Sequence, residues 1–210
     1  MIALDLPGSA ENKANIADVT MQAYVNTVVE AIEKRNDKVV LLGHSLAGAV
    51  ISQVAELIPE KIDRLIYVTA MLLKDGDTSL GVLQNDPSSE ILPNAIFSED
   101  GSYVTLSDET VRTILLNDEN NADYLDEIVP KFLYKQATEP FTAVANLSEE
   151  KFGSVDKHYI RTSNDKVVTP LAQDKMPTNW KTQSVVTVES GHIPLTSIPE
   201  KLVEEIRRID

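Results

Sequence analysis

The eight residues LLGHSLAG at positions 41–48 constrain the fold of this chain more than any other segment. A serine stands there between a short apolar run, typical of a buried strand, and a stretch with the apolar spacing of a helix. This context is that of a nucleophile elbow, in which the residues two before and two after the serine must be small. Gly43 and Ala47 meet that requirement, although glycine is the usual residue at the second position and here comes one residue later, as Gly48.

The elbow predicts that Ser45 projects its hydroxyl above the carboxyl edge of a sheet. The backbone N–H of Leu46, at the start of the following helix, would then face the position where an oxyanion forms. The alternative interpretation is a serine that caps a helix after a glycine turn, which is common. The strand before the serine and the helix after it favour the nucleophile.

Apolar runs and helical periodicity alternate in the first third of the chain. Strands are predicted at residues 2–6, 39–42 and 65–68, and helices at 20–35 and 46–57. Asp18 and Thr20 are the candidate N-caps of the first helix. The continuous apolar run 39–42 is typical of a parallel strand covered on both faces. The order predicts an α/β fold with a mostly parallel sheet flanked by helices.

The alternation stops between residues 74 and 145. Polar clusters there separate short helical stretches at 110–116 and 124–134, which predicts a helical insertion lying on the sheet. Strands are expected again at 158–160 and 184–188, and helices at 171–176 and 199–206. Because roughly 100–200 residues make one domain, residues 1–210 are expected to form a single domain that contains this insertion.

The charge of the chain limits its partners. Its 210 residues include 33 acidic and 19 basic side chains, a formal net charge of −14. Nucleic acids and anionic membranes are polyanions and repel such a surface, so neither is an expected partner. No apolar run reaches the ~18 residues of a membrane helix, and no signal peptide is evident, so a cytoplasmic location is predicted. A homodimer is compatible with the sequence, which does not determine the oligomeric state.

The residue types and motifs of the chain argue against a metal or cofactor site. Cysteine is absent, which excludes disulfides, thiolate nucleophiles and zinc–cysteine sites. Three histidines are too few for a multi-histidine metal site, and no glycine-rich phosphate or dinucleotide motif occurs. The acidic stretch 118–123 resembles a calcium loop only in composition, because it lacks the required glycine and glutamate, and predicts a solvated turn. No metal and no cofactor are therefore expected.

A nucleophilic serine needs a base, and His192 is the best candidate. It follows the predicted strand 184–188, at the edge of the sheet where Ser45 is expected. His44 is predicted to point away from the hydroxyl into the flank of the sheet, and His158 to be a packed strand residue. The alternative for His192 is a solvated loop histidine.

An acid must orient the base, and Asp165 follows the predicted strand 158–160 at the same edge. The alternative is an ordinary turn aspartate. Asp156 lies before that strand, and Asp174 lies on the next helix. The order Ser45, Asp165, His192 along the chain matches one of the three common orders of serine hydrolases.

Taken together, the sequence resembles the α/β-hydrolase superfamily, in particular its methylesterase and hydroxynitrile-lyase branch and the bacterial esterase relatives. The resemblance is carried by residues 3–8, 39–50, 63–68, 149–153, 158–161 and 190–192. It implies an α/β-hydrolase fold, with Ser45 as nucleophile, Asp165 as acid, His192 as base and residues 74–145 as a cap over the pocket.

Two departures from that branch affect the expected activity. Its lyases carry a lysine directly after the histidine, whereas this chain has Ile193, which favours ester hydrolysis. Members of the branch also begin with an additional strand, loop and helix, roughly 30 residues in all. That unit, which normally supplies a second oxyanion donor, is missing here, so we expect a chain truncated relative to the family.

The expected function is hydrolysis of a small carboxylic ester through a serine acyl-enzyme. A hydroxynitrile lyase and a non-catalytic protein that binds a small molecule are the alternatives. Tyr103, Phe132, Tyr134 and Phe141 are candidates either for the pocket lining or for a core within the cap.

Overall fold

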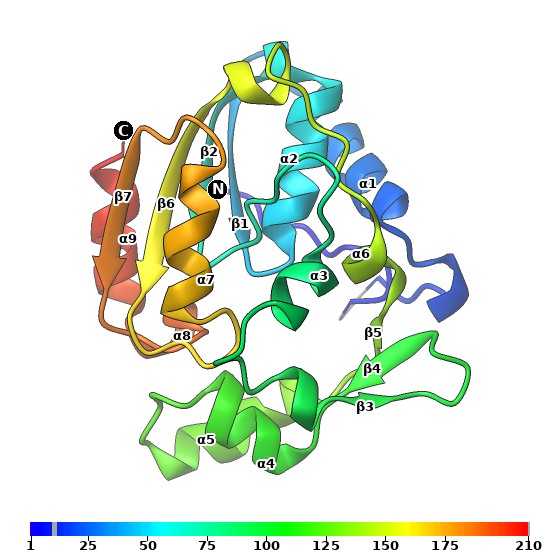
Figure 1. The fold of residues 1–210 in the computed structure, drawn as a ribbon, viewed down its shortest axis with the longest axis vertical. Coiled ribbons are helices and arrows are strands. Elements are labelled where there is room, and N and C mark those ends of the chain that lie inside the picture. The colour runs from blue at the N-terminus through cyan, green and yellow to red at the C-terminus, as the bar shows by residue number, and fades with distance from the viewer. Residues whose placement is uncertain (10–11, 210) are drawn as a thin grey trace.

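The computed structural model describes residues 1–9 and 12–209. At its centre lies a parallel sheet in the order β1-β2-β6-β7 (Figure 1). Its strands are β1 (Val39–His44), β2 (Ile62–Val68), β6 (Asp156–Thr162) and β7 (Ser184–Val188). The predicted parallel sheet is confirmed, and the observed strands begin up to three residues before the predicted ones.

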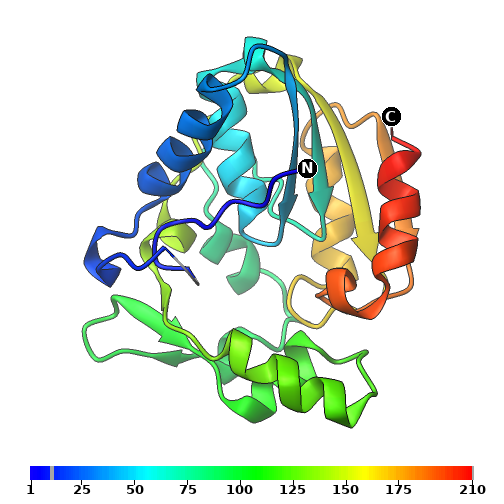
Figure 2. The ribbon, with the colours of Figure 1, turned by 180° about the vertical axis from the view of Figure 1, so that it is seen from behind.

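Helices cover the two faces of this sheet unequally (Figures 1 and 2). One face carries α1 (Met21–Glu33), α2 (Ala47–Leu57) and α7 (Pro170–Lys175), and the other carries α9 (Pro199–Arg207), preceded by the short α8 (Pro194–Ser197). The Thr20 hydroxyl caps α1 by accepting a hydrogen bond from Ala23 N at 3.1 Å, as predicted for one of the two candidate caps.

Strand β2 occupies the centre of the core. Its residues Leu65 to Val68 are at most 2% exposed, because helices lie against both faces and a strand pairs with each edge. The Tyr67 ring stacks parallel to the Tyr159 ring of β6, with 6.1 Å between centroids. The buried hydroxyl of Tyr67 is satisfied by Ser52 on α2 at 2.8 Å, so the helix is fixed to the sheet by a polar contact as well as by apolar packing.

Strand β1 is less covered than its sequence predicts. Val40 is 45% exposed and Leu42 is 39% exposed, so the expectation of a strand covered on both faces is wrong. In the described part of the chain β1 pairs with β2 alone and is therefore an edge strand. Side chains on its inner face still join the main core, as Leu41 does.

The predicted strand at residues 2–6 is also not observed. These residues are irregular and mostly exposed, and Ile2 is 63% exposed. A strand requires a neighbour to satisfy its backbone N–H and C=O groups, and none of the described strands pairs with this segment. A short apolar run alone does not supply such a neighbour.

Residues 74–145 form a layer across the carboxyl ends of the strands (Figure 1). The predicted helical stretches appear there, one of them partly as the π-helix η4 (Val111–Leu115). A small antiparallel sheet in the order β3-β4-β5 was not predicted, because strands of two or three residues show too little alternation to be recognised. The elements of this layer are α3 (Ser79–Gln84), β3 (Ile96–Phe97), β4 (Tyr103–Thr105), α4 (Asp108–Thr110), η4, α5 (Ala122–Ile128), β5 (Gln136–Ala137) and α6 (Glu139–Thr142).

The remaining elements are single turns of 3-10 helix. They are η1 (Ile16–Asp18), η2 (Pro59–Lys61), η3 (Leu92–Asn94), η5 (Val129–Phe132), η6 (Phe152–Ser154) and η7 (Met176–Thr178). Among the described residues, none of the helices has the length and apolar character needed to cross a membrane.

Candidate active site

The turn between β1 and α2 holds Ser45 in a strained conformation. Its φ angle is +53°, a left-handed value that is uncommon for a residue with a side chain. A Cβ at Gly43 would lie 2.7 Å from the carbonyl oxygen of Ala47, and one at Gly48 would lie 2.7 Å from the backbone N of Met71. Both glycines are therefore needed for the close approach of the turn.

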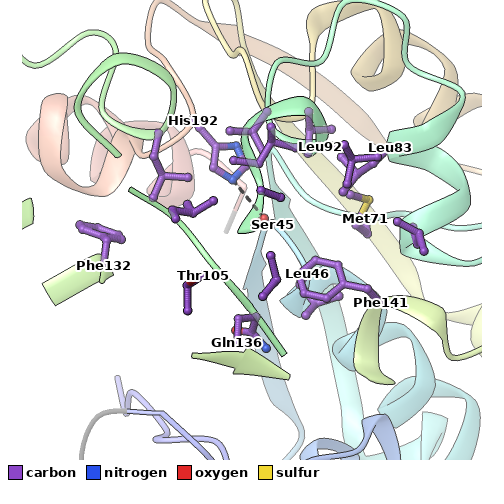
Figure 3. A pocket seen from close by; sticks show the side chains of 18 of the residues that line it. Ser45, Leu46, Met71, Leu83, Leu92, Thr105, Phe132, Gln136, Phe141 and His192 are labelled. Carbon is purple, nitrogen blue, oxygen red and sulfur yellow. Dashed lines mark hydrogen bonds between the residues drawn. The ribbon is translucent and has the colours of Figure 1, made fainter. Parts of the chain in front are cut away.

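Ser45, His192 and Asp165 form one hydrogen-bonded chain. His192 Nε2 lies 3.0 Å from Ser45 Oγ, as drawn by the dashed line in Figure 3, and His192 Nδ1 lies 2.8 Å from Asp165 Oδ2. His192 is 2% exposed and Asp165 is 3% exposed. Since a carboxylate can only accept, Nδ1 carries the proton and Nε2 is free to accept from the serine hydroxyl.

Asp165 is held by donors on both of its oxygens. Oδ1 accepts from the backbone N–H groups of Val167 at 2.7 Å and Val168 at 3.0 Å. Oδ2 accepts from the Thr69 hydroxyl and from Gln173 Nε2, the latter at 3.2 Å, in addition to the imidazole. The carboxylate is thereby fixed by backbone and side chains around the carboxyl ends of β2 and β6.

These contacts keep Asp165 ionised although it is buried. Burial by itself would raise the pKa of its carboxyl group. The charge and hydrogen bond of His192, together with the donors Thr69 and Val167, outweigh burial and hold the pKa below its usual value. A carboxylate that is charged near pH 7 is therefore available to orient and stabilise an imidazolium.

His44 makes no hydrogen bond with Ser45, which agrees with the prediction that its side chain points away from the hydroxyl. The prediction did not include its contact with the base: its ring lies against the His192 ring, with 4.9 Å between centroids. Its Nε2–H donates to the backbone carbonyl of His192 at 2.7 Å. Burial, and then the charge of a protonated His192, lower the pKa of His44 to about 4, so the ring is neutral near pH 7.

His158 lies in β6, as expected of a packed strand residue, and its Nδ1 is 2.8 Å from Ser184 Oγ on β7. It is not part of the hydrogen-bonded chain. Within residues 1–9 and 12–209 no group of three or more histidine, aspartate or glutamate side chains is arranged to hold a metal ion.

Leu46, the predicted oxyanion donor, is the N-cap residue of α2 and follows Ser45 directly. Helix α2 begins at Ala47, so the amide of Leu46 belongs to the first turn, where N–H groups have no acceptor within the helix. Leu46 and Ser45 border the same cavity. The positive end of the helix dipole adds to the attraction for an anion at this point.

The cavity above Ser45 has a volume of about 530 Å³ and an apolar lining (Figure 3). Most of the lining comes from residues 74–145, and no Asp, Glu, Lys or Arg side chain of the described residues belongs to it. Of the four candidate aromatic residues, Phe132, Tyr134 and Phe141 border the cavity. Tyr103 does not, and its ring instead receives the ammonium of Lys135 at 4.3 Å from the centroid.

Sequence reasoning missed three residues that support this site. Thr69 and Gln173 donate to Asp165, and Asp118 accepts from the loop that carries His192. The prediction of a solvated acidic turn at 118–123 is therefore wrong for Asp118. No local pattern distinguishes these residues, because each contact joins segments far apart in the chain; the strained φ of +38° at Thr69 is visible only in the structure.

A parallel sheet with a strained serine elbow at its carboxyl edge defines the class of α/β hydrolases. The sequence profile described as the Alpha/beta hydrolase family matches residues 1–205. The chain therefore belongs to the α/β-hydrolase family.

Its relatives are named as esterases and hydrolases. It is 28% identical to the putative chloroplastic methylesterase 11 of Arabidopsis thaliana over 225 residues, which cover 99% of this chain and 56% of the relative. It is 30% identical to the pyrethroid hydrolase of Sphingobium wenxiniae over 212 residues, which cover 97% of this chain and 75% of the relative. The chain thus spans little more than half the length of the first of these proteins.

Solved structures resemble this fold closely. A crystal structure of the pyrethroid hydrolase PytH superposes with a TM-score of 0.81 at 26% identity, covering 97% of this chain and 83% of the other. Polyneuridine aldehyde esterase superposes with a TM-score of 0.82 at 20% identity, covering 99% of this chain and 86% of the other. At that identity the second likeness supports the fold alone.

Proposed function

We propose that this protein is a serine carboxylesterase in which Ser45 is the nucleophile, His192 the base and Asp165 the acid. The observation that carries the proposal is the hydrogen-bonded chain, with 3.0 Å from His192 Nε2 to Ser45 Oγ and 2.8 Å from His192 Nδ1 to Asp165 Oδ2. These are hydrogen-bond distances for proton transfer without rearrangement. The names of the relatives, methylesterase and pyrethroid hydrolase, support the same reaction type.

In the acylation step the Ser45 oxygen attacks the ester carbonyl carbon while its proton passes to His192 Nε2. Asp165 stabilises the resulting imidazolium through Nδ1–H. The carbonyl oxygen becomes an oxyanion that accepts a hydrogen bond from the N–H of Leu46. The bond to the alcohol then breaks, and the alkoxide leaves as an alcohol with the proton of His192.

In the deacylation step a water molecule gives its proton to His192 and attacks the acyl carbon. The second tetrahedral oxyanion uses the same donor at Leu46. Collapse breaks the bond to Ser45, whose oxygen recovers the proton from His192, and the carboxylic acid is released. One water is consumed and the enzyme returns to its starting state.

The lining of the cavity favours an uncharged ester with apolar groups. A charged substrate would leave water for a cavity that no Asp, Glu, Lys or Arg side chain of the described residues borders, which is unfavourable. A volume of about 530 Å³ falls within the ~300–1,000 Å³ typical of small-molecule sites. Residues 74–145 supply most of this lining, so we propose that they act as a cap that selects the substrate.

The experiment is hydrolysis of p-nitrophenyl butyrate by the wild-type chain and by Ser45→Ala. We expect steady turnover by the wild type and loss of about 10⁴-fold or more in kcat for the variant, because the nucleophile is removed. A fluorophosphonate probe should label the wild type and not the variant. Equal turnover in both would refute the assignment, and an absence of labelling in the wild type would indicate a binding protein without turnover.

The lyase alternative receives no support from the residue after His192. Ile193 is 7% exposed and lies in an apolar cluster, where no cation could receive a cyanide leaving group. We therefore expect no cyanide release from cyanohydrins under conditions in which p-nitrophenyl butyrate is hydrolysed.

A further inference from the structure

The segment that lines the cavity also holds the loop that carries His192. Asp118 lies in the turn directly after the π-helix η4, and its Oδ2 accepts from the backbone N–H of Gly191 at 2.6 Å. The same oxygen accepts from the hydroxyl of Ser190 at 2.9 Å. Both donors immediately precede His192, so the Asp118 carboxylate fixes the backbone from which the imidazole extends.

The approach between the turn and the loop depends on Gly191. A Cβ at this position would lie 2.3 Å from Asn117 Oδ1 and 2.7 Å from Asp118 Oδ1. Real Cβ atoms do not come so close to another atom, so with any other residue at position 191 the side-chain ends of Asn117 and Asp118 would have to shift. The contact is therefore a close approach of these two side chains to the backbone of Gly191.

The residue on the other side of His192 is anchored to the same segment. Ile193 packs in a buried apolar cluster with Val111 and Leu116 from η4 and the turn after it, and with Val129. Its burial is independent of the Asp118 hydrogen bonds. The loop is thus held before His192 by a carboxylate and after it by apolar packing.

The turn also reaches the loop that carries the acid. Asn117 Nδ2 donates to the backbone carbonyl of Asn164 at 2.9 Å, next to Asp165. The N–H of Asn164 in turn donates to the carbonyl of Ser190 at 2.9 Å. The adjacent residues Asn117 and Asp118, called here the Asn117/Asp118 clamp, therefore link the acid loop and the base loop.

We propose that Asp118 is a positioning residue of the reaction, which acts by holding the His192 loop so that the imidazole reaches Ser45. The proposal rests on the function proposed above. Asp118 does not border the cavity and contacts neither Ser45 nor the imidazole, so it acts through the backbone of Ser190 and Gly191. The cap then has a second role, because one of its turns completes the catalytic geometry.

This position predicts an effect on kcat and not on KM. A misplacement of a reacting group by about 1 Å can lower the rate about 10²-fold. We expect Asp118→Ala to lower kcat about tenfold to hundredfold on p-nitrophenyl butyrate and to change KM less than about twofold, because the cavity is untouched. Asp118→Asn keeps an acceptor oxygen in the same place and should stay within about threefold of the wild type.

The matched control is Asp123→Ala, which removes an exposed carboxylate of the same acidic stretch, and should leave kcat unchanged. A wild-type kcat in Asp118→Ala, or an equal loss in Asp123→Ala, would overturn the proposal. If Asp118→Ala does not fold, Ser190→Ala replaces it, since it removes one of the two donors to the carboxylate. That variant should lower kcat about threefold at unchanged KM, and no change would count against the proposal.

Amide hydrogen exchange at Gly191 tests the contact between Asp118 and the His192 loop independently of ester hydrolysis. We expect a protected amide in the wild type and exchange at least about tenfold faster in Asp118→Ala, whether or not the protein is an esterase. Equal exchange in both would overturn the clamp by itself. Faster exchange in the variant together with no ester hydrolysis by the wild type would instead remove the proposed function, and with it the positioning role.

Discussion

The acid and the base of the candidate active site are held in place by different means. Asp165 is surrounded by donors from the body of the sheet, with two backbone amides on one oxygen and Thr69 and Gln173 on the other. His192 sits on a loop that is supported through its backbone by His44, by Asp118 about seventy residues earlier, and by the packing of the neighbouring Ile193. The acid is therefore held by several donors on its own carboxylate, whereas the base is held mainly through the backbone on either side of it.

This difference has a physical reason. A buried carboxylate must be satisfied on several lone pairs, or its desolvation would neutralise it, so its surroundings are dense with donors. An imidazole that shuttles a proton needs an acceptor nitrogen facing the substrate, which leaves only its other nitrogen and its backbone for support. The base is thus expected to be more sensitive to changes in its surroundings than the acid.

The largest effect should follow from removing the charge of the acid. Asp165→Asn keeps the size of the side chain but can present an amide donor to Nδ1, which favours the wrong tautomer of His192. We expect kcat on p-nitrophenyl butyrate to fall about 10⁴-fold. The control is Asp174→Asn. Asp174 is an exposed carboxylate on α7 and forms an ion pair with Arg161 on β6. A loss in Asp165→Asn no greater than in the control would contradict the role of the acid.

A smaller effect on stability is expected from His44, which supports the base. Its folded pKa of about 4 lies below the usual 6.5, so between these values the unfolded chain binds a proton that the folded chain does not. Stability is therefore lost as pH falls from 6.5 toward 4. Between pH 7 and pH 4.5 the unfolding free energy of the wild type should fall by about 2–3 kcal/mol more than that of His44→Gln.

The measurement is urea unfolding of both proteins at the two pH values. Asp165 does not obscure it, because a carboxyl whose pKa is lowered loses its contribution only below its unfolded pKa of about 3.9. If the two proteins lost equal stability over this range, the buried neutral state of His44 would be contradicted.

The smallest effect should come from removing one donor to the acid. Thr69→Val keeps the β-branched shape at a strained φ of +38° and removes only the hydroxyl. Because other donors remain on Asp165, we expect a loss of about 1 kcal/mol in transition-state stabilisation, about fivefold in kcat. Thr69→Ser should restore the rate. A loss in kcat greater than that of Asp118→Ala would contradict the expectation that the base is more sensitive to its surroundings than the acid.

Much of the fold could be predicted because its signals are local. The glycines around Ser45 reflect a turn that only small residues permit, and the apolar stripe of α1 with its cap at Thr20 is visible in one short window. Burial was predicted less well. Residues 39–42 and 65–68 look alike as apolar runs, yet β1 is an edge strand with exposed Val40 and β2 is central and buried, since burial depends on what lies alongside.

The sequence by itself determined the order of the four strands of the main sheet and the helices between them, the serine turn and the three residues proposed for the reaction, because each follows from spacing or from a known order along the chain. Only the tertiary structure decided which strand lies at the edge, that short strands pair within residues 74–145, and that Asp118 supports the loop of His192. Those features arise from contacts between residues that are far apart in the chain. Such contacts produce no periodic or local pattern in the sequence, because the type of one residue does not reveal which distant residue it contacts.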